Sequence, residues 1–203
     1  MSRANLVLSN IDKVKFSSDS IKTQYIEEMK FIRACMYFNL VSEFGDVPVV
    51  TEALSDADQA TALTVRAPRE KVYTQIVQDL KDVVSSNLPV VQSLANKGRV
   101  SMQAANGLLG QVYLTMATTL DPGNAATNLE NAKAYLTACY NMRTFANLSD
   151  LPFPDVFDAN KKGTNPEIIW QIVYVQGDPV YSSNLAANNQ AKGETINSMY
   201  RSC

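Results

Sequence analysis

The stretch from Tyr25 to Pro48, YIEEMKFIRACMYFNLVSEFGDVP, restricts the possible folds more than any other part of the chain. Its apolar residues recur at spacings of three and four, which predicts a stripe along one helix. That stripe consists of Tyr25, Met29, Ile32, Met36, Leu40 and Phe44. Phe31, Tyr37, Phe38 and Val41 widen it so far that other elements must cover most of the helix.

The two ends of this helix are predicted from local chemistry. Asp19 or Ser20, in a polar break, is suited to cap its first turn. Gly45 is expected to end it as a C-cap residue, and Pro48 prevents its continuation. The positions that we expect to face water are Glu27, Glu28, Lys30, Asn39 and Glu43.

Four further segments have helical periodicity, and the predicted fold class is therefore all-α. They run over residues 4–14, 68–87, 101–118 and 127–142, with Pro68 at the start of the second and Ser101 as the cap of the third. The last two resemble a tetratricopeptide-type helix hairpin, because Leu109, Gly110 and Tyr113 match an L-G-x-x-Y pattern. Gly107 and Gly110 lie inside a helix, which indicates close packing rather than phosphate binding.

Two segments are predicted to be non-helical. Residues 51–66 show no periodicity and indicate a surface loop. Ile168 to Val175 alternates β-branched and aromatic residues, which predicts a strand and hence a small β addition to the bundle. The tail over residues 176–203 is rich in Asn, Ser and Ala, and we expect a loop or a disordered segment there.

Composition excludes several classes of function. The net charge of −2 and the scattered Lys and Arg residues give little support for nucleic-acid binding. No run approaches the roughly 18 apolar residues of a membrane span. The chain has no histidine, which removes the commonest general base and most zinc sites. Its three cysteines are widely spaced, so they predict neither a disulfide framework nor a metal cluster.

Several short motifs, in a fixed order, resemble one family. They are Lys30-Phe31-Ile32-Arg33-Ala34, Tyr37-Phe38-Asn39-Leu40-Val41, Phe44-Gly45-Asp46-Val47-Pro48, Pro68-Arg69, Leu88-Pro89, Gly98-Arg99-Val100, Ala104-Ala105, Leu108-Leu109, Tyr113-Leu114 and Asn165-Pro166-Glu167-Ile168-Ile169-Trp170. Their order and spacing over residues 25–175 are similar to the SusD/RagB family of surface glycan-binding lipoproteins. We therefore expect a tetratricopeptide-like helical bundle.

The resemblance also implies how the protein works. A SusD-like protein captures an oligosaccharide at the outer membrane and presents it to a SusC-like TonB-dependent transporter, without a catalytic step, metal or cofactor. Such proteins are longer and lipid-anchored. Residues 1–203 are thus expected to be one SusD-like domain that lacks a leader with a lipid-acceptor cysteine, the first helices and the C-terminal part. Localisation at the cell outer membrane, exposed on the surface, follows from the resemblance alone.

Sugar binding needs aromatic faces that stack on pyranose rings and polar groups that bind hydroxyls. The best local supply is Gln176, Asp178, Tyr181 and Asn184, which we predict as ligand-binding residues. A linker without any binding role explains the same composition equally well. Trp170 alternates with core positions and is predicted to pack, and Arg33 and Arg99 are predicted to tie helices to loop carbonyls or acids.

Two other functions stay open at this point. An intracellular tetratricopeptide-type adaptor that binds a peptide or protein partner in a concave groove fits the helix hairpin. A glycoside hydrolase would need two carboxylates across a cleft, for which Glu27-Glu28, Asp56/Asp58 and Asp150/Asp155 are candidate pairs. Each pair lies on a polar helix face or in a loop, so we predict that the protein is not an enzyme.

Overall fold

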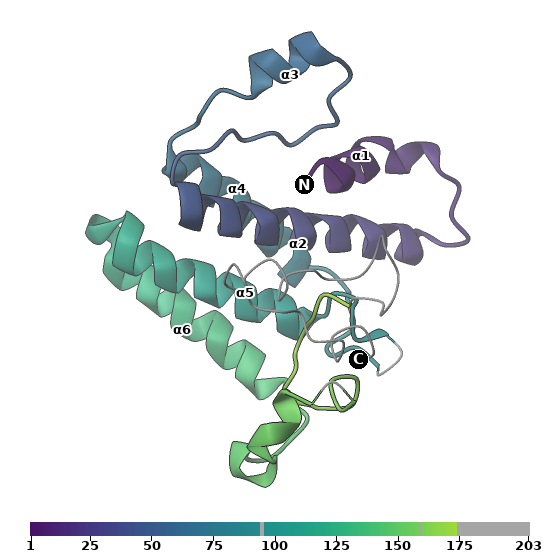
Figure 1. The fold of residues 1–203 in the computed structure, drawn as a ribbon, viewed down its shortest axis with the longest axis vertical. Coiled ribbons are helices and arrows are strands. Elements are labelled where there is room, and N and C mark those ends of the chain that lie inside the picture. Colours follow the sequence, from purple (N-terminus) through teal and green to yellow (C-terminus); the bar gives the residue numbers. More distant parts are fainter. Residues whose placement is uncertain (94–95, 159, 174–203) are drawn as a thin grey trace, which may run out of the picture. The chain divides into compact units, whose positions relative to one another are not determined.

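The computed structural model describes residues 1–93, 96–158 and 160–173. Its α-helices are α1 (Ser2–Asn10), α2 (Asp19–Phe44), α3 (Ala57–Leu63), α4 (Arg69–Val84), α5 (Met102–Thr115) and α6 (Ala125–Asn141) (Figure 1). Short 3₁₀ segments follow α1 and α6, and a π-helical turn extends α5 over Met116–Leu120. The all-α fold class is confirmed.

The chain divides into two units, Met1–Trp170 and Gln171–Cys203. All six helices belong to the first unit, and only residues 171–173 of the second are described. The prediction of one domain with a loop or disordered tail over residues 176–203 therefore stays a prediction, because that tail lies outside the described residues.

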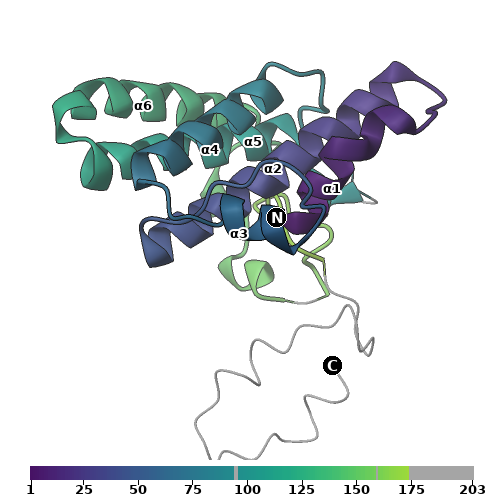
Figure 2. The same cartoon turned by 90° about the horizontal axis from the view of Figure 1, so that it is seen from above.

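Helix α2 is the central element, as predicted. The Ser18 side chain caps it by accepting from the backbone N–H of Ile21, so the cap lies one residue before the two predicted candidates. Gly45 ends it with a φ of +67°, a left-handed conformation that glycine adopts without strain. The helix contacts α1, α4 and α5 (Figures 1 and 2), and its buried residues lie between Glu27 and Val41.

The buried face of α2 is rotated from the predicted stripe. Its innermost residues are Phe31, Ala34, Tyr37, Phe38 and Val41, whereas Tyr25 and Phe44 are 40% and 61% exposed. Glu27 and Glu28, predicted to face water, are each only 7% exposed. The helix is apolar on so many sides that periodicity could not select one face. Glu28 is paired with Arg99, 71 residues away, whereas Glu27 is paired with Lys30 of the same helix.

Helix α4 packs on α2 through a buried polar network. The Arg33 guanidinium donates to both carboxylate oxygens of Asp79, at 2.8 and 2.7 Å. It also donates to the backbone oxygen of Thr51 at 2.9 Å and to the Asn5 side-chain oxygen at 3.3 Å. The prediction that Arg33 ties a helix to an acid and a loop carbonyl is confirmed, and this one side chain joins α1, α2, α4 and the loop after Val50.

Helices α5 and α6 lie side by side as a hairpin (Figures 1 and 2). Ser101 caps α5 as predicted, by accepting from the backbone N–H of Ala104. A Cβ atom at Gly110 would lie 2.6 Å from the Leu136 Cγ atom, and one at Gly107 would lie 3.2 Å from the Cys139 Sγ atom. The glycines therefore permit close helix packing, as the sequence indicated.

Two predicted non-helical segments differ from the structure. The expected loop over residues 51–66 contains α3, whose first turn is capped by the Asp56 side chain. The expected strand from Ile168 to Val175 is absent over its described part, residues 168–173. A strand needs a partner for its backbone, and here the backbone oxygen of Ile168 instead accepts from the Lys97 ammonium.

Candidate functional site

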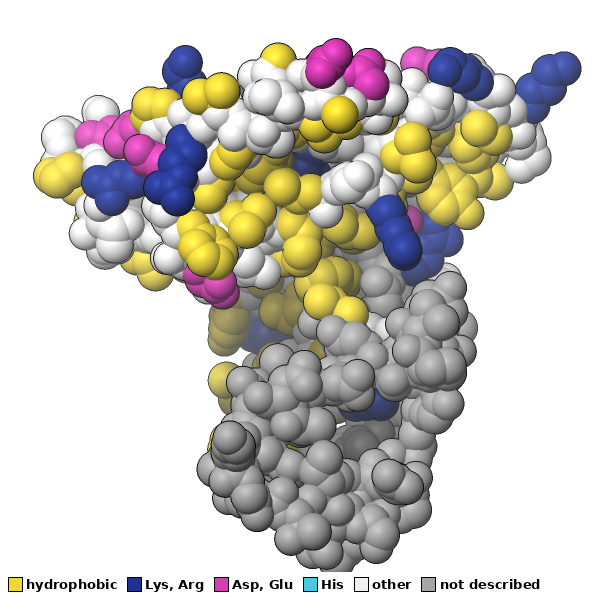
Figure 3. All heavy atoms as spheres, turned by 45° about the horizontal axis from the view of Figure 1, so that its top comes forward, with side chains coloured by type: hydrophobic (Ala, Val, Ile, Leu, Met, Phe, Trp, Pro, Cys, Tyr) yellow, Lys and Arg dark blue, Asp and Glu magenta, His cyan; other side chains and the backbone are white. Residues whose placement is uncertain are grey.

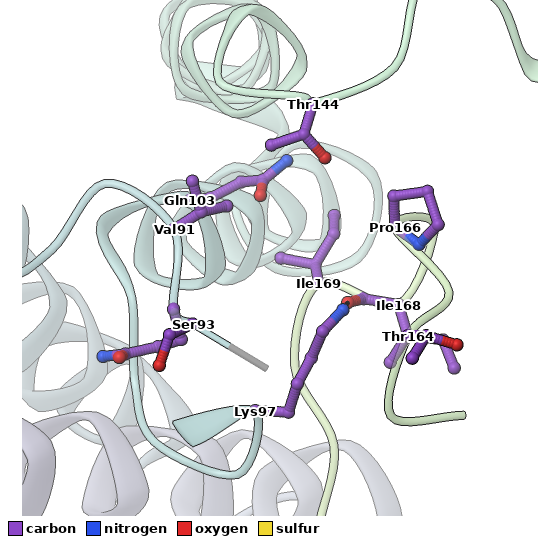
Figure 4. A pocket seen from close by; sticks show the side chains of 10 residues that line it. Val91, Ser93, Lys97, Gln103, Thr144, Thr164, Pro166, Ile168 and Ile169 are labelled. Carbon is purple, nitrogen blue, oxygen red and sulfur yellow. Dashed lines mark hydrogen bonds between the residues drawn. The ribbon is translucent and has the colours of Figure 1, made fainter. Parts of the chain in front are cut away.

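A pocket of about 270 Å³ lies where the segment before α5 meets the segment that ends the helical unit (Figure 4). Val91, Ser93 and Lys97 come from the first segment, Gln103 from α5, and Thr144 from the turn after α6. Thr164, Pro166, Ile168 and Ile169 come from the last segment. Three parts of the chain that are distant in sequence therefore build one hollow.

The N-terminal turn of α5 fixes one wall of this pocket. The backbone N–H groups of Met102 and Gln103 have no partner within the helix, and they donate to the backbone oxygens of Pro89 and Val90 at 2.9 and 3.0 Å. The Gln92 side chain donates to the backbone oxygen of Val100 at 2.6 Å. These bonds hold residues 89–92 against α5.

Gln103 is the most enclosed polar side chain in the lining. It is 4% exposed, and its amide nitrogen donates to the backbone oxygen of Cys139 at 3.3 Å. Its amide oxygen accepts no hydrogen bond from the described residues. This oxygen is thus an acceptor held in a fixed position for a donor that enters the pocket.

Lys97 forms the opposite side. Its side chain reaches toward Ile168 (Figure 4), and its ammonium donates to the backbone oxygens of Asn165 and Ile168, at 2.9 and 3.3 Å. Burial lowers the pKa of this amine from its usual value, because no carboxylate compensates for the lost water. Lys97 therefore fastens the segment from Asn165 to Ile168 rather than offering a free cation to a ligand.

Trp170 fastens the end of the same segment. Its indole N–H donates to the backbone oxygen of Gly98 at 3.2 Å, and its ring meets Phe31 edge-on at 5.1 Å between centroids. The prediction that Trp170 packs against the core is confirmed. Arg99, next to Gly98, donates to both carboxylate oxygens of Glu28 at 2.8 and 2.9 Å, as its predicted role requires.

The four predicted ligand-binding residues, Gln176, Asp178, Tyr181 and Asn184, lie outside the described residues, and their role stays a prediction. The pocket of Figure 4 was not predicted from the sequence. Its polar groups are common residue types at unremarkable spacings, and only the meeting of three chain segments brings them together.

In each carboxylate pair proposed for hydrolysis, at least one member has a structural partner instead. Glu28 binds Arg99, Asp155 binds Lys161 at 2.7 Å, and Asp56 caps α3. Asp150 accepts from the backbone N–H of Asn147 in a short turn. On the face shown in Figure 3, Lys and Arg side chains are scattered among hydrophobic and acidic ones rather than merged into a stripe. Within the described residues, none of the helices has the length and apolar character to span a membrane.

Comparison with known sequences identifies the family. Residues 1–114 match the family model SusD-like_3, described as "Starch-binding associating with outer membrane". The chain is 26% identical over 174 residues to SusD-like protein P25 of Formosa agariphila, which covers 85% of this chain and 30% of that protein. It thus spans about a third of the length of such relatives.

Solved structures agree with this assignment. A laminarin-binding SusD-like protein is 30% identical with a TM-score of 0.68, over 86% of this chain and 36% of that one. A crystal structure with a xylogluco-oligosaccharide is 27% identical with a TM-score of 0.72, over 89% and 35%. The family model matches more than half of the chain, and the chain belongs to the SusD-like family.

Proposed function

We propose that the protein to which this chain belongs binds an oligosaccharide at the cell surface and presents it to a SusC-like TonB-dependent transporter in the outer membrane. The observation that carries the proposal is the family match over residues 1–114, supported by relatives whose structures are described as laminarin-binding or contain a xylogluco-oligosaccharide. The family assignment favours this function over the intracellular adaptor.

The mechanism that we propose is non-covalent and uses no metal or cofactor. The helices supply a rigid scaffold, and the sugar contacts come from the segments that leave it. Residues 164–170 are fastened by Lys97 and Trp170, so the chain leaves the helical unit from a fixed point. We place sugar contacts at Gln176, Asp178, Tyr181 and Asn184, a few residues further along the chain.

The pocket of Figure 4 is a candidate for an additional contact. It offers the Gln103 oxygen as an acceptor, hydroxyls of Ser93 and Thr164, and apolar surface from Ile168 and Ile169. This combination of a few polar groups in an otherwise apolar hollow is typical of small-molecule sites.

Affinity electrophoresis of the whole chain through gels that contain laminarin, xyloglucan or starch tests the proposal. We expect retardation by at least one of them, and weaker retardation for Tyr181→Ala because a stacking ring is lost. Gln103→Leu tests the pocket separately, since it removes the acceptor at similar volume. The control is Gln78→Leu, an exposed residue of α4.

Two results would contradict the proposal. No retardation by any polysaccharide, for a chain whose circular dichroism shows folded helices, removes glycan binding by this segment. Release of reducing sugar from a polysaccharide would show catalysis and contradict a protein that only binds.

A further inference from the structure

A second pocket, distant in sequence from the first, lies between the start of α2 and the turn that follows α4. Its volume is about 240 Å³. Ser20, Thr23, Gln24 and Glu27 line one side, and their spacing of three and four places them on one face of α2. The residues from Ser86 to Pro89 line the other side.

The exposure of the lining side chains falls from the mouth of this pocket to its floor. Ser20, Thr23 and Asn87 are exposed, whereas Glu27 and Leu88 are each 7% exposed. Glu27 therefore belongs to the floor. The pocket is open to solvent on one side and ends at a buried carboxylate on the other.

The Glu27 carboxylate is only half satisfied. Its Oε1 atom accepts from the Lys30 ammonium at 3.2 Å, and the same ammonium also binds Asp82 at 3.0 Å. Its Oε2 atom is buried and has no hydrogen-bond partner among the described residues. An unpartnered buried acceptor is costly, and the described residues supply no donor for this oxygen. Burial also raises the pKa of this carboxyl group.

Three of the neighbouring polar side chains are also unused, whereas the Ser86 hydroxyl donates to the backbone oxygen of Val83 at 2.7 Å. The side chains of Ser20, Thr23 and Asn87 form no hydrogen bonds with the described residues, whereas Gln24 donates to Glu28 at 3.3 Å. Hydroxyls and amides both donate and accept, and so does a hydroxyl group of a ligand. The pocket thus combines a buried hydrogen-bond acceptor with side chains that can both donate and accept hydrogen bonds.

A metal cation fits this lining poorly. Hard cations such as Ca²⁺ take six to eight oxygen ligands, several of them carboxylates. Glu27 is the only carboxylate in the lining, and the Lys30 ammonium lies 3.2 Å from it. A neutral ligand that carries several hydroxyl groups satisfies the Glu27 oxygen without this repulsion.

We infer that this pocket is a subsite for a single hydroxyl-rich ring, a terminal sugar unit, whose O–H group donates to the Glu27 carboxylate. The volume lies below the range of about 300–1,000 Å³ for larger ligands, which suits one ring. Leu88 and Pro89 supply apolar surface for the C–H face of the ring. The inference deepens the proposed function and rests on it for the choice of a sugar as probe.

Titration of the isotopically labelled whole chain with D-glucose, followed by NMR, tests the inference. We expect saturable shifts of the backbone amides of Ser20, Thr23, Gln24 and Asn87. Glu27→Met removes the acceptor at similar volume, and we expect binding at least tenfold weaker. The matched control is Glu43→Met, which changes an exposed acid of the same helix and should leave binding unchanged.

Asn87→Ala gives a second route if Glu27→Met fails to fold, because Asn87 is exposed. We expect this variant to weaken glucose binding several-fold. If these amides do not shift up to about 100 mM glucose, the Glu27 oxygen binds an ordered water only, and the inference is overturned. That concentration lies far above a dissociation constant in the millimolar range, so even weak binding would be detected. Equal binding by Glu27→Met and the original chain would overturn it as well.

The two proposals fail in distinguishable ways. If polysaccharide still retards the chain while glucose leaves the pocket around Glu27 unchanged, the subsite is wrong and the proposed function stands. If glucose shifts these amides while every polysaccharide fails to bind, the subsite stands as a monosaccharide site and oligosaccharide capture by this chain is wrong.

Discussion

Two helix contacts in this molecule are stabilised by opposite means. Between α2 and α4, a buried ion pair joins Arg33 and Asp79, which are 7% and 2% exposed. Between α5 and α6, the helices approach so closely that a carbon added at Gly110 would collide with Leu136, and one added at Gly107 would make a tight contact with Cys139. The α2–α4 contact therefore depends on two charged side chains, and the α5–α6 contact depends on the lack of a side chain at two glycines.

This difference teaches how each contact should fail. Removing one member of a buried ion pair leaves an uncompensated charge, which is strongly destabilising. Adding an atom to a tightly packed contact forces neighbouring side chains out of their rotamers. A shortening substitution should therefore damage the α2–α4 contact most, and a lengthening one should damage the α5–α6 contact.

The largest expected effect comes from Arg33→Met. The Asp79 carboxylate would keep only the Gln75 side chain as a donor, so we expect unfolding in urea to be easier by about 3–5 kcal/mol. The double variant Arg33→Met/Asp79→Leu should recover much of this loss, because no buried charge remains. The control is Lys161→Met, which breaks an exposed pair of equal length at a cost of about 0–1 kcal/mol. A loss for Arg33→Met as small as that of the control would break the comparison.

Gly110→Ala probes the other contact. The added carbon would lie 2.6 Å from Leu136, and we expect a loss of about 1–3 kcal/mol in urea unfolding despite the better helix propensity of alanine. Gly107→Ala is the matched control, because its carbon would lie 3.2 Å from the Cys139 Sγ atom, and its cost should be smaller. If Gly110→Ala and Gly107→Ala have the same free energy of unfolding, close approach of the helices does not determine the stability of the α5–α6 contact.

Tyr37→Phe sharpens the comparison within α2. The Tyr37 hydroxyl donates to the backbone oxygen of Val50 at 2.8 Å and accepts from the Val50 N–H at 2.6 Å. The Val50 oxygen keeps the Asn5 amide as a donor, but its N–H loses its partner. We expect a loss of about 1–3 kcal/mol, measured by urea unfolding. An unchanged stability would show that water replaces the hydroxyl.

The smallest expected effect concerns Glu27 and depends on pH. Burial raises the pKa of this carboxyl group above its ordinary value of 4.5, so the folded chain holds the proton more tightly than the unfolded chain. Its contribution to stability is complete below pH 4.5 and is lost as the pH rises through the folded pKa. Glu27→Gln should therefore gain stability relative to the original chain as the pH rises above 4.5. A difference that stays constant with pH in urea unfolding would contradict the shift.

The sequence predicted those structural roles that depend only on the type of one residue and not on its partners in the fold. Gly45 ends α2, Ser101 caps α5, and Gly110 permits close packing, since each role follows from the local chemistry of one side chain. The ordered motifs also indicated the family that the comparisons then confirmed.

Pairing across the fold could not be predicted in the same way. The sequence suggested that Arg33 and Arg99 bind acids or carbonyls but did not say which ones, because Asp79 and Glu28 lie 46 and 71 residues away. Glu28 looked exposed for the same reason, and Glu27 looked exposed because the sequence did not show that the turn after α4 covers it. The expected strand after Asn165 is missing over residues 168–173, because an alternating pattern does not reveal whether a partner strand exists.

The sequence by itself determined that this chain forms a helical bundle around Tyr25–Phe44 and belongs with glycan-binding relatives, because helix periodicity, caps and motif order are local properties. Only the tertiary structure decided which face of α2 is buried, which charges are paired, and where the two pockets described above form. Those features arise where segments distant in sequence pack together. Only this packing buries a charge or an unpaired oxygen, and burial is what changes its free energy.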